Sequence, residues 1–200
     1  MSESMQPLPM AAPEGKPTKE DETLTDPAKA DYKAGREFLA KGDYAQAAMA
    51  MHNALHGFEE QGNEQGVANA ADRLGDVCMA REEYRLALDH FQRAKAICEK
   101  QHDLFSVTAL NKKKAVAHRR LGELDQALAL LFDVFDHDSQ LRNPKGTVEV
   151  LEAIAGVYQE QGERRKGADA LRTIATIHKN FKHTRLAEEY EERARQAEQG

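Results

Sequence analysis

Few residues of this 200-residue chain have the types and spacing that catalysis needs. Its only cysteines are Cys78 and Cys98, and it contains no C-x-x-C, H-E-x-x-H, glycine-rich phosphate loop or nucleophile elbow. Free cysteine is among the most buried residue types, so both thiols are expected in a core. We therefore expect a protein that is not an enzyme and that uses no cofactor.

One pair of histidines has a spacing that suits a metal. His52 and His56 stand four residues apart, which places them on one face of a helix, and Glu59 or Glu60 could add a ligand. A polar outer helix face explains the same pattern without a metal. Because no further residue that would orient the imidazoles can be identified, the polar face is favoured and no metal is expected.

The segment 107–120 is the most distinctive charged stretch. It contains no acid although the whole chain has a net charge of −6, and its bases are Lys112, Lys113, Lys114, Arg119 and Arg120. Such clustering is unfavourable unless something acidic faces it. Glu149 and Glu152 of the following repeat could neutralise Lys112 and Lys113. Alternatively, the cluster could bind an acidic peptide or a chain-terminal carboxylate through charge-assisted hydrogen bonds.

A third candidate for the same cluster is the chain's own acidic run at 20–22. Residues 1–25 are acidic and rich in proline and are expected to be disordered, because they have too little apolar surface to offset the entropy of ordering. An Asp26-Pro27 pair follows, in which an N-cap type precedes proline at the first helical position. Order is therefore expected to begin at residue 26.

The overall composition excludes several classes of protein. A sequence pI near 5.8 argues against a general nucleic-acid binder, and the short basic stretch lacks the aromatic residues on which bases stack. No apolar run is long enough to span a membrane, so no membrane insertion is expected. Two cysteines do not make a disulfide scaffold, and the N-terminal residues do not resemble an export signal, so a cytoplasmic protein is expected.

Helical spacing continues from residue 26 onward, and the sequence repeats without gaps at a period of 40. Each unit has a turn flanked by small residues, seven positions before it and five after it, which allow two helices to cross closely. The small pairs are Gly35 and Ala47, Gly75 and Ala87, Ala115 and Ala127, and Ala155 and Gly167. Asn63, Asp103 and Asn143 recur as N-cap types at the same period.

This pattern resembles the tetratricopeptide repeat (TPR). The family's small–aromatic–small signature is visible in Leu74-Gly75-x-x-Cys78 followed by Tyr84-x-x-Ala87-x-x-x-Phe91-x-x-Ala94. The period of 40 is similar to the variant found in spindle-orientation adaptors. The resemblance implies an all-α, right-handed α-solenoid of four helix hairpins with a concave face. Repeats are expected at about 26–62, 63–102, 103–142 and 143–182, and 183–200 is expected to form a C-terminal capping helix.

The resemblance further implies a non-catalytic adaptor or scaffold that binds another protein. The partner is expected to lie in the concave groove as an extended segment, with an acidic portion at repeat three. The expected binding residues are Arg36, Leu39, Arg73, Met79, Lys112, Lys113, Val116, Arg119 and Arg120. The alternative is a structural subunit or a self-assembling homo-oligomer that uses the convex helices.

Overall fold

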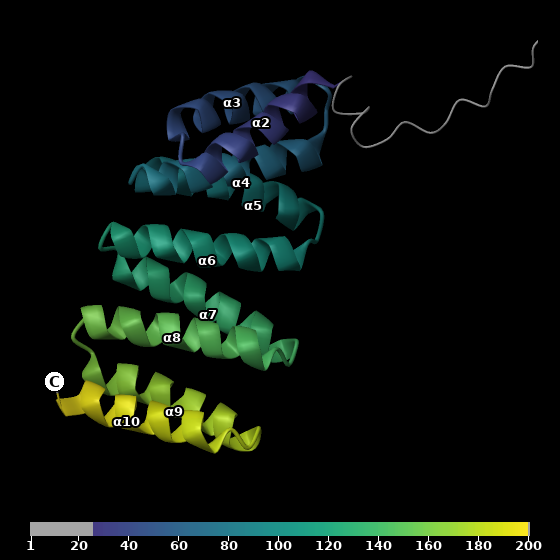
Figure 1. Ribbon diagram of the computed structural model, residues 1–200. Helices are drawn as coiled ribbons and strands as arrows, with labels where there is room; N and C mark the ends of the chain where they lie inside the picture. The colour runs from purple at the N-terminus through teal and green to yellow at the C-terminus, as the bar shows by residue number, and fades with distance from the viewer. Residues whose placement is uncertain (1–25, 200) are drawn as a thin grey trace, which may run out of the picture.

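The computed structural model describes residues 26–199, which form nine helices and no strands (Figure 1). The all-helical repeat array expected from the sequence is confirmed within this range. The acidic segment 1–25 lies outside the described residues. The helices are α2 (Pro27–Lys41), α3 (Tyr44–Glu60), α4 (Glu64–Ala80), α5 (Tyr84–Lys100), α6 (Leu104–Arg120), α7 (Leu124–Gln140), α8 (Pro144–Glu160), α9 (Arg164–Asn180) and α10 (Thr184–Gln199).

The first helix of each pair begins at the residue that the sequence predicts. Asp26 accepts hydrogen bonds from the Ala28 and Lys29 amides, and Pro27 occupies the first turn. The side chains of Asn63, Asp103 and Asn143 likewise each accept from the amide three residues on. These caps satisfy amides that a helix start leaves unpaired, so the 40-residue period of the caps fixes where each repeat starts.

Tight turns separate the helices at intervals of twenty residues. A residue with a left-handed backbone occupies each connection: Gly42, Gly62, Glu82, His102, Gly122, Arg142, Gly162 and Lys182. The turns within hairpins lie on the left of Figure 1, and the linkers to the next hairpin lie on the right. The start of α2 also lies on the right. The molecule thus has two edges with different chain connections.

Small residues bring the paired helices together as the spacing predicts. A Cβ on Gly35 would lie 2.9 Å from Cγ of Met51, and a Cβ on Gly75 would overlap the Phe91 ring. Met51 and Phe91 are fully buried. The N-terminal core is therefore built by large side chains that fill the space left at a glycine.

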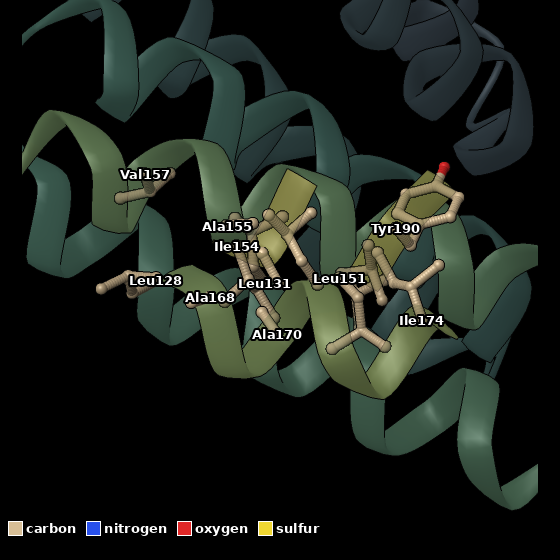
Figure 2. Close-up of a cluster of buried hydrophobic side chains, with 14 of the residues drawn as sticks. Leu128, Leu131, Leu151, Ile154, Ala155, Val157, Ala168, Ala170, Ile174 and Tyr190 are labelled. Atoms are coloured by element: carbon tan, nitrogen blue, oxygen red, sulfur yellow. The ribbon is translucent and has the colours of Figure 1, made fainter. Parts of the chain in front are cut away.

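The C-terminal core uses aliphatic side chains instead. Leu131, Ile154 and Ile174 pack within it, and Tyr190 of α10 covers its end (Figure 2). Among the apolar residues of α10, Tyr190 and Ala194 are buried whereas Leu186 is exposed. None of the helices within residues 26–199 has the length and apolar character that crossing a bilayer requires.

Candidate partner-binding face

The surface formed by α2, α4, α6, α8 and α10, here called the first-helix face, is hollowed between successive helices. A pocket of about 190 Å³ lies between α4 and α6, and one of about 410 Å³ lies between α6 and α8. Another, of about 490 Å³, is lined by residues of α8, α9 and α10 together with Gly162. Hollows thus follow one another from α4 to α10, so an extended chain laid across these helices would meet three in succession.

The α4–α6 hollow contains a network of paired charges. Lys113 Nζ lies 2.6 Å from Asp72 Oδ1 and 2.8 Å from Asp76 Oδ1, and Arg73 Nη1 lies 2.8 Å from Asp76 Oδ2. Burial lowers the pKa of the Arg73 guanidinium, but Asp72 and Asp76 outweigh it and the net pKa is raised. Two bases thus face two acids, which leaves little net charge here for a partner.

The α6–α8 hollow keeps free charge. Arg119 Nε and Nη2 lie 2.9 and 2.6 Å from Glu160 Oε1, and the guanidinium packs against Gly156, which has no side chain to obstruct it. This hydrogen bonding lowers the pKa of Glu160. Arg120 is exposed and makes no hydrogen bond or close ion pair with a residue that the structure describes, although its charge also helps to lower the pKa of Glu160. Val116 is 48% exposed beside it. One acid therefore faces two bases and an apolar side chain.

Lys112 lies apart from both hollows. Its Nζ is 3.3 Å from Oδ2 of Asp138, a buried carboxylate of α7 that also accepts a hydrogen bond from Asn143 Nδ2. Neutralisation of Lys112 and Lys113 by Glu149 and Glu152, one of the alternatives that the sequence left open, is wrong. Glu152 instead accepts hydrogen bonds from Tyr190 and Arg193 of α10.

The acids that pair with Lys113 and Arg119 of α6 stand at a fixed separation from them in the sequence. Lys113 and Asp72 are 41 residues apart, as are Arg119 and Glu160. Arg193 and Glu152 repeat this separation. Charged pairs between successive first helices are thus separated in the sequence by 41 residues, which is the repeat period plus one. A search for acids at that separation finds each of these partners, whereas choosing the nearest acidic helix does not.

The remaining expected binding residues lie outside these three hollows. Arg36 is exposed on α2, and Leu39 and Met79 are half-buried. Met79 packs against the N-terminal core. The structure therefore brings together Val116, Arg119 and Arg120, and separately Arg73 and Lys113.

The cysteines and histidines that were candidates for chemistry contact residues that explain them without a catalytic or metal-binding role. Cys78 and Cys98 are buried and unpaired, and burial is the main cause that raises the pKa of Cys78 to about 11. His52 makes an edge-to-face contact with His90 of α5, and His56 lies 3.5 Å from Glu60. No group of three or more His, Cys, Asp or Glu side chains in residues 26–199 could hold a metal ion.

Comparison with solved structures supports the architecture. The fold is similar to nearly identical TPR-like repeats of a putative kinesin light chain from Podosopora anserina, with a TM-score of 0.72, 16% identity, and 86% of this chain and 87% of that chain covered. It is also similar to aspartyl phosphate phosphatase F from Bacillus subtilis, with a TM-score of 0.55, 16% identity, and coverage of 86% and 49%.

A third similar structure is the APC/C hetero-tetramer Cut9-Hcn1, with a TM-score of 0.50, 19% identity, and coverage of 88% and 38%. No protein-family model and no curated protein matches the sequence. At these identities the likeness concerns the fold, which is that of TPR-like helical repeat proteins.

Proposed function

We propose that the chain is a non-catalytic scaffold that binds an extended segment of another protein across its first-helix face. The observation that carries this proposal is the α6–α8 hollow, where Arg119 and Arg120 outnumber Glu160 and Val116 is exposed. We place it in the cytoplasm, which the two unpaired thiols support.

An acidic residue followed by an apolar one suits this hollow. Arg120 has donors that no described residue uses, so a partner carboxylate could accept charge-assisted hydrogen bonds from it. Val116 offers apolar surface one helical turn away. The face is built from packed helices, so little of it must be ordered when the partner binds.

The other expected residues take lesser roles in this proposal. Lys113 and Arg73 face their own acids, and Lys112 holds Asp138, so these three shape the surface more than they attract a partner. Arg36, Leu39 and Met79 would contact a segment that continues toward α2.

Fluorescence anisotropy of the full-length chain tests the proposal. The probe is a fluorescein-labelled peptide that alternates Glu and Leu over about 12 residues, which spans roughly 40 Å when extended. We expect Val116→Ser/Arg120→Gln to weaken binding about tenfold, since it removes one charged and one apolar contact. The matched control is Met49→Ser/Arg165→Gln, on α3 and α9. Equal affinity for the wild type and both variants would rule out this hollow.

The convex helices support a second candidate, a self-assembling scaffold. Met49 of α3 and Phe132 of α7 are 56% and 43% exposed, and His52 and His56 are exposed on α3. An oligomer formed through these helices would bury such side chains. Sedimentation equilibrium of the wild type and Met49→Ser/Phe132→Ser distinguishes the candidates: a monomeric wild type would exclude self-assembly at the concentrations measured.

A further inference from the structure

Three of the four linkers that join one hairpin to the next carry exposed apolar residues, and all of these lie on one side of the molecule. Large apolar side chains are most exposed there: Phe105 is 80% exposed, Leu141 63%, Leu104 60% and Phe181 55%, so four of the five highest values belong to this side. These linkers lie on the right of Figure 1. Exposed apolar side chains scattered at random over the nine helices of residues 26–199 would not concentrate at one edge of the molecule.

Cations accompany the apolar residues at the last two linkers. We call this region the basic edge and define it by Leu141, Arg142, Lys145, Phe181, Lys182 and Arg185. All four cations are exposed, and none has a hydrogen-bond or ion-pair partner within residues 26–199. Lys179, one turn before Lys182, is also exposed without such a partner. The nearest acids along α10, at 188 and 189, lie one turn beyond Arg185.

The backbone holds these side chains at the tips of rigid turns. Arg142 and Lys182 have φ values of 51° and 59°, and their amides donate to the carbonyls of Ser139 and Lys179. Leu141 and Phe181 directly precede them. Each tip therefore presents an apolar side chain with a cation next to it, without a loop that must first be ordered.

We propose that the basic edge docks on an anionic lipid surface. Charge complementarity supports this occupant, because each unpaired cation close to an anionic leaflet adds to binding. The two apolar tips, Leu141 and Phe181, lie one repeat apart, so they are separated by two helix widths, roughly 16–20 Å. A bilayer interface can receive several separated tips at one depth, whereas a bound peptide needs a continuous groove. The contact is peripheral and involves no spanning segment.

The chain's own acidic run is a poorer occupant on grounds of distance. Asp26 lies beside the first of these linkers, where Gln61 Nε2 donates to its carboxylate at 2.9 Å. The run 20–22 precedes Asp26 by four to six residues, a reach of about 20 Å at most. The α7–α8 linker lies two repeats away, roughly 32–40 Å. A lipid surface has no such limit.

Co-sedimentation of the full-length chain with vesicles tests the proposal. The vesicles are phosphatidylcholine alone or with about 30% phosphatidylserine, an anionic content chosen to create a negative surface potential. We expect binding only to the anionic vesicles and at least tenfold weaker binding by Arg142→Glu/Lys182→Glu. The matched control, Lys41→Glu/Arg165→Glu, makes the same charge change on the opposite edge and should bind like the wild type.

A second pair of variants tests the apolar contribution. Leu141→Ser/Phe181→Ser should weaken vesicle binding severalfold, whereas Met49→Ser/Leu86→Ser, exposed elsewhere, should not. Circular dichroism of every variant checks that the fold is retained. Absence of binding to anionic vesicles, or equal losses in both charge-reversed variants, would overturn the proposal. Binding of the basic edge to soluble polyglutamate but not to vesicles would assign it to an acidic protein and would also overturn it.

Discussion

The basic residues of α6 and those of the basic edge have the same charge but different surroundings. Lys113 and Arg119 meet acids of neighbouring first helices, and Lys112 meets the buried Asp138. Arg142 and Lys182 meet no described acid. Three of the five bases in the dense run are thus neutralised, whereas Arg120 and the cations of the basic edge remain available. Whether a basic residue keeps a free charge depends on the side chains that face it in the fold, and the number of basic residues in a stretch of sequence does not show this.

The largest expected effect tests whether α6 is held by internal partners. Asp138→Ala removes the acceptor of Asn143 Nδ2 and the partner of Lys112, and we expect it to lower the free energy of unfolding by about 2 kcal/mol. Urea denaturation measures this. Asp136→Ala, at an exposed position of the same helix, should change the free energy by less than about 0.5 kcal/mol. Similar losses of unfolding free energy for Asp138→Ala and Asp136→Ala would show that the contacts of Asp138 do not stabilise the fold.

The next effect compares one lysine from each region. Lys113→Met removes one of the two cations that pair with Asp72 and Asp76 and leaves only Arg73 of that network, so we expect a loss of about 1 kcal/mol. Lys145→Met removes an unpaired cation and should change stability by less than about 0.5 kcal/mol. Thermal unfolding of both variants gives the difference. A larger loss from Lys145→Met would show that the basic edge has a structural role.

A substitution at a tip should act in the opposite direction. Arg142 has a left-handed backbone, which glycine adopts without the steric cost of a Cβ. We expect Arg142→Gly to raise the free energy of unfolding by roughly 0.5 kcal/mol while it removes an edge cation. The midpoint of urea denaturation measures it. A clear destabilisation would mean that the Arg142 side chain makes a stabilising contact.

The smallest effect concerns pH. Hydrogen bonding by Arg119 lowers the pKa of Glu160 below 4.5, so this pair stabilises the folded chain above that pH and loses its contribution as the pH falls through the lowered pKa. The pair is partly exposed, so its contribution is under about 1 kcal/mol. The stability difference between wild type and Arg119→Gln should shrink from pH 7 to pH 3. A difference that does not change with pH would exclude this ion pair.

The repeat itself could be predicted because local rules fix it. The first helices start at local side-chain caps, which are Asp26, Asn63, Asp103 and Asn143. A glycine lies opposite Phe91 because a Cβ there would overlap the ring. The partners of the α6 lysines could not be predicted in this way. They depend on the offset and rotation of successive helices, which bring residues 41 apart together and leave Glu149 away from Lys113.

Leu186 illustrates the same limit at the C-terminal end. Its spacing on α10 matches that of Tyr190 and Ala194, yet only those two are buried. Periodicity identifies a stripe of positions on a helix. How much of that stripe the neighbouring helix covers depends on the crossing, and α9 does not cover the beginning of it.

Because each helix packs mainly against its neighbours in the chain, the number of repeats sets the distances between surface features. The main helix contacts join elements that are adjacent in the chain, and α2 also touches α4. Stability in such a stack is a sum over units and their interfaces. A whole 40-residue hairpin added between α5 and α6 would therefore leave every existing interface type intact while moving the two basic linkers one further step from α2. The spacing of surface features can thus change in discrete increments, without a new core.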